Sequence, residues 1–264
     1  MYLSAATIPS HGQYRSTDPA MRYAILSDIH SNLPALQRVL AELVEADIGK
    51  YLCLGDIVGY GAQPNECCAI IQELDAICIR GNHDQGILQP DFEQWFNAAA
   101  RACLVWTRAQ LTAENRAFLQ RLEETAQVDS ITICHGSIPD PNFYITSPQG
   151  ALPSFQVMAG TVGFFGHTHS AEYFVQRQVG RLPEHWPSPA GGTCSVEAGC
   201  RYLINPGAVG QPRDGNPQAA YAMYDEESGQ IELRRVEYDI AAAQRKMIHA
   251  GLPPSMSLRL SHGL

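Results

Sequence analysis

Short apolar runs alternate with helical periods along the first third of the chain. The runs at 23–26, 51–54 and 76–79 have the length of buried strands. After the first run, apolar residues recur at the spacing of an amphipathic helix over 36–44, with Asn32 placed to cap this helix. A second helix is expected over 66–74. Because strands that alternate with helices usually form a parallel sheet, the pattern predicts an α/β fold with covering helices.

The remainder of the chain is richer in strands. One long helical region is expected around 92–106, where apolar residues share a face (Phe92, Trp95, Phe96, Ala99, Cys103 and Trp106), and another helix is expected over 113–122. Strands are expected near 130–134, 162–165, 173–176, 202–204, 219–224 and 231–235, with a closing helix over 240–250. The Pro- and Gly-rich stretch 180–199 is interpreted as a loop insertion without chemistry. We expect a flexible extension over 1–20 and a single domain over 21–264.

Composition and charge narrow the functional classes. The chain has 264 residues and 45% hydrophobic content, and no apolar run approaches the roughly 20 residues that span a bilayer. The formal net charge of −9 argues against an extended nucleic-acid surface, but it allows a small phosphorylated substrate if metal ions supply local positive charge. We expect the eight cysteines to be reduced and the compartment to be cytoplasmic, with Cys194 and Cys200 as the one pair that could form a bridge.

Candidate ligand residues follow the predicted strands, at the point where each strand ends. Because ligands of α/β sheets bind beyond the carboxyl ends of the strands, we expect these five segments to converge on one site. They contain Asp28 and His30, then Gly55 and Asp56, then Gly81 to Asp84 with Asn82 and His83, then His135 and Gly136, and finally Gly166 to His169 with His167 and His169.

The residue types indicate a pair of transition-metal ions. Imidazole combined with carboxylate suits Mn²⁺, which is our first choice, or Fe, Zn, Co or Ni. His167 and His169, one residue apart, reach two ions more easily than one, and Asp56 can bridge the two. Taken singly, each segment has an ordinary interpretation: Gly-Asp is often a turn, His135 a strand-end histidine and His83 a helix cap. The order of all five segments favours a metal site.

These motifs resemble those of the calcineurin-like metallophosphoesterase superfamily, which are D-x-H, G-D, G-N-H-[DE], H followed by G, and G-H-x-H. All five lie within 28–169, and the resemblance extends from residue 21 to the C-terminus. Segments such as SDIHSN, GDIVGYGAQPNE and NPGAVGQPRDGNP are similar to the small bacterial branch of phosphodiesterases and diadenosine-tetraphosphatase relatives. The resemblance implies a four-layer αββα sandwich with two central mixed β-sheets.

The resemblance also implies residue roles. The first metal would be held by Asp28, His30, Asp56 and His169, and the second by Asp56, Asn82, His135 and His167. His83 matches the family histidine that contacts the phosphate and protonates the leaving oxygen, a role that suits imidazole. The nucleophile would be a metal-bridging hydroxide that attacks phosphorus in line. The expected reaction is therefore hydrolysis of a phosphodiester or a nucleotide polyphosphate.

The chain departs from the protein Ser/Thr phosphatases, which extend the second motif as G-D-x-x-D-R-G. Here residues 56–61 contain neither that Asp nor that Arg, so the residue that orients His83 is left open. Arg213 is a candidate substrate contact, together with Asn82 and His83, although an exposed turn explains it equally well. Asn97 and Arg101 fit a substrate cap or, more simply, a solvated helix face. The alternative functions are a phosphomonoesterase or protein phosphatase, and a non-catalytic metal-binding scaffold.

Overall fold

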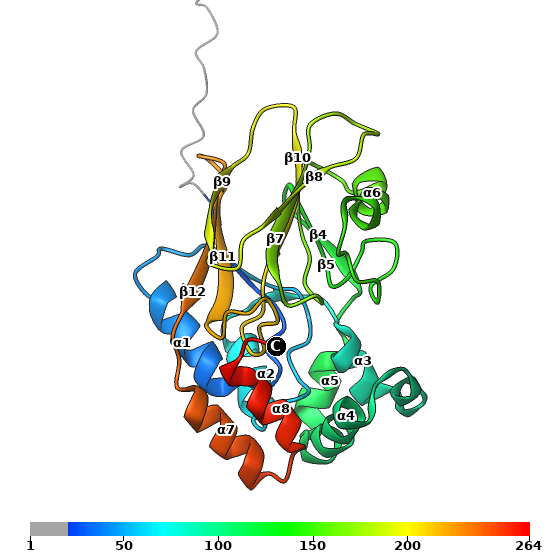
Figure 1. Cartoon of the computed structure of the whole chain (residues 1–264), viewed down its shortest axis with the longest axis vertical. Coiled ribbons are helices and arrows are strands. Elements are labelled where there is room, and N and C mark those ends of the chain that lie inside the picture. Colours follow the sequence, from blue (N-terminus) through cyan, green and yellow to red (C-terminus); the bar gives the residue numbers. More distant parts are fainter. Residues whose placement is uncertain (1–20) are drawn as a thin grey trace, which may run out of the picture.

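Two mixed sheets of six strands each form the centre of the protein, which the computed structural model describes over residues 21–264 (Figure 1). Across the first sheet the strands follow the order β3 (Ile77–Cys78), β2 (Lys50–Cys53), β1 (Arg22–Leu26), β11 (Ala219–Asp225), β12 (Gln230–Val236) and β9 (Gly192–Ser195). Across the second sheet the order is β4 (Thr125–Val128), β5 (Ile131–Cys134), β6 (Val162–Phe164), β10 (Arg201–Pro206), β7 (Ala171–Gln176) and β8 (Glu184–Pro187). The four-layer sandwich with two central mixed sheets is therefore confirmed.

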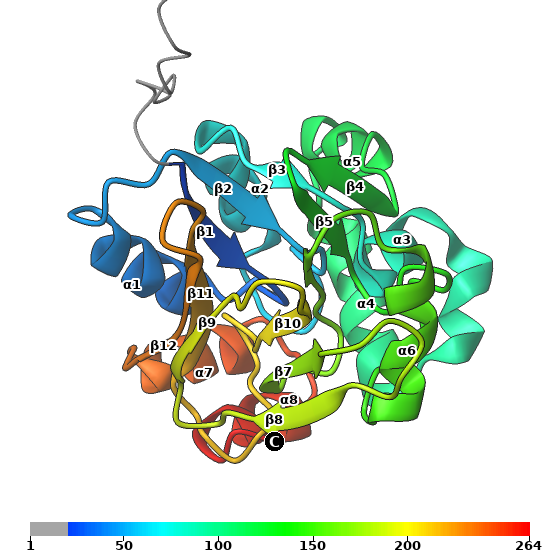
Figure 2. The same cartoon turned by 90° about the horizontal axis from the view of Figure 1, so that it is seen from above.

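Helices cover the outer faces of both sheets (Figures 1 and 2). The first sheet carries α1 (Leu33–Leu43), α2 (Pro64–Glu73), α4 (Ala98–Gln110) and α5 (Ala113–Gln120), which share one apolar cluster with it. The second sheet carries α6 (Pro148–Val157). The other helical segments are α3 (Asn82–Leu88), α7 (Ile240–His249), α8 (Pro254–Leu258) and the 3₁₀ turns η1 (Pro90–Trp95) and η2 (Arg259–Ser261). Within residues 21–264 we find no helix with both the length and the apolar character needed to cross a bilayer.

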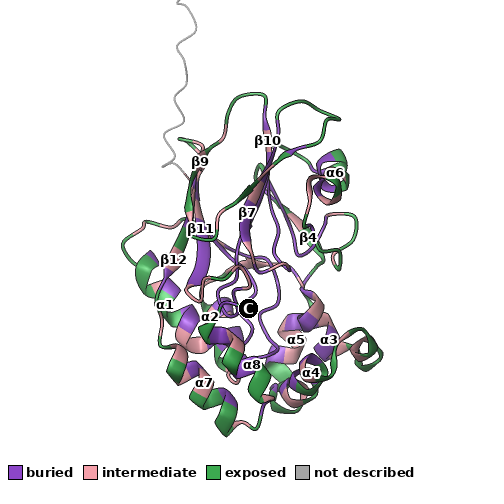
Figure 3. Ribbon diagram, viewed as in Figure 1, coloured by how far each residue is buried: buried purple, intermediate pink, exposed green. Residues whose placement is uncertain are grey.

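Strand β1 shows why the apolar runs are continuous. Tyr23 and Ile25 point into the core between the sheets, whereas Ala24 and Leu26 point to the core under the helices. Alternate side chains of a strand face opposite ways, so a strand buried on both faces has no polar position. Burial of a side chain such as Ile25 contributes about 1.5–3 kcal/mol to the free energy of folding. Figure 3 shows this burial along the central strands, with the exposed residues on the outer helix faces.

The parallel strands of the two sheets are the ones that lead to the candidate ligands. In the first sheet β1, β2 and β3 are parallel, with Leu26 paired to Cys53 and Cys53 to Cys78. In the second sheet β5, β6 and β10 are parallel. The carboxyl ends of parallel strands lie at one edge of a sheet, so the segments that follow β1, β2, β3, β5 and β6 can meet.

Most of the predicted elements are confirmed within one to three residues, but two expectations were wrong. The region 92–106 is not one helix, because η1 ends before Asn97, whose side chain accepts a hydrogen bond from Ala100 N and begins α4. Trp95, expected on the buried face, is 76% exposed. The stretch 180–199 contains β8 and β9, which form one outer edge of each sheet. The sequence pattern did not predict α3, β4, α6 or α8.

The cysteines form no bridge. All eight lie in the described part of the chain, and all are free, including Cys194 and Cys200. The extension expected over 1–20 lies outside the described residues.

Candidate metal centre

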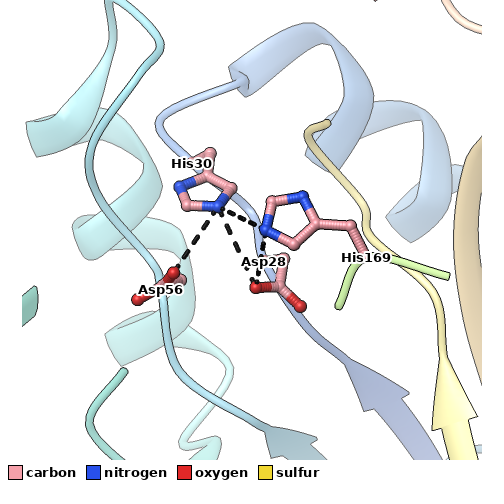
Figure 4. A group of neighbouring side chains, drawn as sticks. All are labelled: Asp28, His30, Asp56 and His169. Atoms are coloured by element: carbon pink, nitrogen blue, oxygen red, sulfur yellow. Dashed lines mark hydrogen bonds and ion pairs between the residues drawn. The ribbon is translucent and has the colours of Figure 1, made fainter. Parts of the chain in front are cut away.

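The five polar segments converge at the carboxyl ends of the parallel strands. Side-chain atoms of four residues lie within 4.8 Å of one another in a first group, which consists of Asp28, His30, Asp56 and His169 (Figure 4). A second group with the same spacing consists of Asp56, His135 and His167. The remaining candidate, Asn82, joins this second group, because its Oδ1 lies 3.1 Å from His135 Nε2. Asp56 belongs to both groups, so two adjacent sites share one carboxylate.

Each of the four histidines uses one ring nitrogen to contact a backbone carbonyl. A carbonyl oxygen can only accept, so in each pair the ring nitrogen carries the proton and donates it. In a neutral ring the other nitrogen then has a free lone pair, and this nitrogen faces the other site residues. The four contacts are His30 Nδ1 to Val58 O at 3.2 Å, His135 Nδ1 to Leu54 O at 2.7 Å, His169 Nδ1 to Gln211 O at 2.6 Å, and His167 Nε2 to Asn142 O at 3.1 Å.

The ring nitrogens that make no carbonyl contact and the carboxylates face one another at short range. His30 Nε2 and His169 Nε2 are 3.1 Å apart, and His169 Nε2 is 3.2 Å from Asp28 Oδ1. His135 Nε2 is 3.4 Å from Asp56 Oδ2. Ligand atoms around one transition metal, each about 2.0–2.2 Å from it, lie about 3.0–3.5 Å apart, which matches these distances. Asp28 Oδ1 and Asp56 Oδ2 are buried and accept no hydrogen bond from any group in residues 21–264, so the residues fit metal binding.

The electrostatics of the site keep its carboxylates ionised. Burial alone would raise the pKa of Asp28, but the nearby His169 outweighs it and the pKa is lowered. For Asp56 burial is likewise outweighed, chiefly by His135 and His83, and its pKa lies well below the ordinary value. Burial lowers the pKa of His167 to about 3, so this ring is neutral near pH 7. Ionised carboxylates and neutral imidazoles are the forms that bind metal ions. His135 differs from His167: burial lowers its pKa, but the charge and hydrogen bond of Asp56 outweigh burial and raise the pKa to about 10, so a metal ion would displace its proton.

Left-handed backbone conformations aim the ligands at the site. Asp28, His30, Asp56, His167 and His169 all have positive φ, between 49° and 68°. Each such conformation destabilises the fold by about 1–3 kcal/mol, and such conformations cluster at functional sites.

The backbone at Gly81 lies very close to the shared carboxylate. A Cβ at Gly81 would lie 2.1 Å from Asp56 Oδ1, so only glycine lets this segment approach the shared carboxylate.

His83 lies beside the ligand groups in an aromatic cage. Its ring centroid is 4.3 Å from that of Tyr60, 4.8 Å from His30 and 4.8 Å from Phe96. Burial lowers the pKa of His83 to about 4, and Asp56 only partly opposes this effect. Asp84 does not orient the ring, because its carboxylate accepts from the backbone N–H groups of Val58 and Gly81. The backbone N–H of His83 donates to Asp56 Oδ1 at 2.8 Å, whereas its ring is oriented by packing and not by a carboxylate.

The side chain of Arg213 lies next to this cage, not in an exposed turn. It is half-buried, its Cζ is 5.7 Å from the centroid of the Tyr60 ring, and its Nη2 is 3.3 Å from Tyr60 Oη. Its backbone N–H donates to His169 O at 3.1 Å. Within the described residues it forms no ion pair with a carboxylate, so its charge is available to an anion.

Of the two residues considered for a substrate cap, Asn97 lies at a cavity and Arg101 does not. Asn97 lines a cavity of about 540 Å³ beside Asn82, His83 and His167. Arg101 is exposed and donates to the carbonyls of Glu93 and Phe96, as expected for a solvated helix face.

The sequence reading missed a buried asparagine that supports the ligand loop. Asn205, at 0% exposure, donates through Nδ2 to Gly166 O and to Thr168 Oγ1, both at 2.9 Å. Its Oδ1 accepts from Gly207 N at 2.9 Å. Thr168 lies between His167 and His169, so Asn205 fixes the loop that carries both. The available signal was a polar residue in the apolar run 202–206, where a buried amide needs partners.

Comparisons with known proteins agree with this geometry. The family model described as the calcineurin-like phosphoesterase superfamily domain matches residues 21–229. An uncharacterized protein of Methanocaldococcus jannaschii is 38% identical over 245 residues, which cover 91% of this chain and 97% of that protein. A metallophosphoesterase from Sphaerobacter thermophilus is 38% identical with a TM-score of 0.82, over 93% of this chain and 100% of that one. A hypothetical protein from Pyrococcus horikoshii, 22% identical over 92% of this chain and 99% of that one, shares the fold with a TM-score of 0.76.

Proposed function

The chain belongs to the calcineurin-like phosphoesterase superfamily, and on that premise we propose that it is a metal-dependent hydrolase of phosphodiesters or nucleotide polyphosphates. The observation that carries the proposal is the pair of neutral rings of His30 and His169. Their Nε2 lone pairs face each other at 3.1 Å beside the unpaired Asp28 Oδ1. Three electron-rich atoms at this distance repel one another unless a cation lies among them. A divalent ion satisfies all three.

The residues divide between two ions that share one carboxylate. Asp28, His30, Asp56 and His169 would hold the first, and Asp56, Asn82, His135 and His167 the second. Two divalent ions supply Lewis acidity and a water-derived nucleophile at neutral pH. Mixed nitrogen and oxygen ligands suit Mn²⁺, with Fe, Zn, Co and Ni as alternatives. The carbonyl contacts of the histidines fix the ligands before an ion binds.

His83 is proposed as the general acid. It lines the cavity together with Asn82 and His167, so its ring borders the space in which a phosphate ester would lie. The negative charge of a bound phosphate favours the protonated ring, which can then donate its proton to the leaving oxygen. Asn82 and Arg213 complete the proposed substrate contacts. The guanidinium of Arg213 contacts Tyr60 and Gln211 but forms no ion pair within residues 21–264, so its charge can attract a phosphate.

The test is turnover of bis(p-nitrophenyl) phosphate, p-nitrophenyl phosphate and diadenosine tetraphosphate after metal removal and reloading with Mn²⁺. We expect hydrolysis that depends on added metal, and faster turnover of the diester than of the monoester. His83→Ala should lower kcat by about 10²–10⁴-fold. His249→Ala, on the exposed end of α7, is the matched control and should retain activity.

Metal analysis on the same samples completes the test. We expect about two ions per chain in the wild type and in His83→Ala, because His83 is not among the proposed ligands. A wild type that is inactive with every metal and no more active than His83→Ala would refute the proposal. A faster monoester rate would instead support the phosphomonoesterase alternative.

The compartment is a separate inference. We infer a cytoplasmic location, and the support is that all eight cysteines, each in the described region, are free thiols.

A further inference from the structure

The cavity beside the candidate metal centre has an unusual aromatic wall. Phe92 and Trp95 come from η1, and Phe96 follows them, so three aromatic residues lie within five positions on one side of the 540 Å³ cavity. Tyr144, from the segment between β5 and α6, and Tyr60 also line the cavity. The cavity also contacts Asn82, His83 and His167, so this wall is directly adjacent to the proposed reaction site.

Two of these aromatic side chains are largely exposed at the cavity. Trp95 is 76% exposed and Tyr144 is 49% exposed. An exposed tryptophan at the entrance of a cavity leaves a large apolar face in contact with water, and such faces mark binding sites. Within residues 21–264 the ring contacts of this region involve Phe92, Phe96, Tyr144 and the site histidines, and none involves Trp95.

The rings continue from the cavity wall to the reaction site. Phe92 and Phe96 are 6.0 Å apart, and Phe96 is 4.8 Å from His83. Tyr144 stacks on the proposed ligand His167, with ring centroids 3.8 Å apart and an angle of 27° between the planes. A flat group attached to a phosphate at the site would therefore be near π faces from more than one element.

Polar groups on the same walls argue against a purely aliphatic occupant. Asn97 uses its Oδ1 to cap α4, which leaves its amide N–H groups as donors. Asp140 is an exposed acceptor on another wall, and Asn142 adjoins it. A hydrocarbon would leave these groups without partners, whereas the edge of a nucleobase carries both donors and acceptors.

We propose that the cavity is a nucleobase subsite, in which Trp95 stacks on the base of a nucleotide whose phosphate lies at the metal centre. This inference rests on the proposed function, because it assigns the organic part of the same substrate. Stacking on an exposed aromatic ring contributes about 1–3 kcal/mol per base and tolerates any base. The volume of about 540 Å³ lies within the range that holds small ligands.

The test compares two ligands that differ only in the base. The full-length chain with Mn²⁺ is titrated by calorimetry with adenosine 5′-monophosphate and with ribose 5-phosphate. We expect the nucleotide to bind at least about fivefold more tightly, the fold-change that corresponds to about 1 kcal/mol. Trp95→Ala should remove most of this difference and leave the ribose 5-phosphate affinity unchanged, while Trp95→Phe should retain it.

The chain offers a matched control. Trp186 in β8 is 49% exposed and stacks on Tyr173 in the second sheet, so Trp186→Ala should behave as the wild type does. Equal affinity for the two ligands, no binding of either, or a preference that survives in Trp95→Ala would each overturn the subsite.

Turnover assays keep the two proposals apart. Hydrolysis of bis(p-nitrophenyl) phosphate with no base preference in binding refutes the subsite and leaves the enzyme proposal intact. Base-dependent binding without any turnover refutes the enzyme proposal alone.

Discussion

The substitution Asn205→Ala tests how the fold supports the loop that carries His167 and His169. Asn205 is fully buried and makes three hydrogen bonds, to Gly166 O, Thr168 Oγ1 and Gly207 N. Alanine removes all three and adds no partner. The Gly166 carbonyl and the Gly207 N–H are then left without that partner in a place that excludes water.

The magnitude follows from these contacts. A lost intramolecular hydrogen bond costs about 1 kcal/mol, so three of them predict a loss of about 3 kcal/mol in the free energy of unfolding. For a chain of this size we take an m-value in urea of about 3 kcal/mol/M, so the midpoint should fall by about 1 M. Because the ligand loop loses its support, Mn²⁺ should also raise the midpoint of the variant less than that of the wild type.

The assay is urea unfolding followed by circular dichroism, first with a chelator and then with excess Mn²⁺. Asn65→Ala is the control, since it also removes three side-chain hydrogen bonds, with Gln110, Thr112 and Asn115. Those bonds are exposed or half-buried, so water replaces them and the loss should stay below about 1 kcal/mol. If Asn205→Ala in chelator unfolds at the same midpoint as Asn65→Ala, the reasoning from burial is refuted.

Three further predictions concern the metal site, the reactivity of the thiols and the stability of the fold at acid pH. Asp56→Asn should lower the metal content of the purified protein below one ion per chain, because both ligand groups share this carboxylate. Plasma emission spectrometry measures the metal content, and a variant that holds two ions would contradict a bridging role for Asp56. Native thiols should react slowly with Ellman's reagent at pH 8, with the half-exposed Cys78 and Cys194 ahead of the six buried ones. Burial raises the pKa of Cys194 to about 11 and of Cys103 to about 12, and fast reaction of the buried thiols would count against the fold. Hydrogen bonds from Lys50 and Tyr23 lower the pKa of Asp129, so its stabilising contribution is present above the unfolded pKa of about 3.9 and lost as the pH falls through the lower folded value. Wild type and Asp129→Asn should therefore converge in urea midpoint at acid pH and differ at pH 7, and a constant difference would refute the assignment.

The central strands and the candidate ligands were predictable because their signals are local. A strand such as β1, buried on both faces over residues 23–26, has apolar side chains at these positions, so it stands out in the sequence. The polar segments that end these strands stand out for the complementary reason, since Asp28 or His167 follows directly on an apolar run. Their convergence then follows from the geometry of parallel strands.

The edge strands were not predictable because tertiary pairing alone creates them. Glu184–Pro187 and Gly192–Ser195 are short and largely exposed, so they lack an apolar pattern. The first pairs with β7 and the second with β12, which provide the backbone hydrogen bonds of a strand. The break at Asn97 has a similar origin, because one cap outweighs a helical spacing of apolar residues that extends across it.

The sequence by itself indicated the candidate metal ligands, since the Asp, Asn and His side chains of these five segments offer ligand atoms. The tertiary structure decided how they are held. The partners that fix the rings of His30, His135, His167 and His169 are main-chain carbonyls of Val58, Leu54, Asn142 and Gln211. Every residue carries the same carbonyl, so no sequence pattern marks these four. Only the packing of distant segments places them at the site.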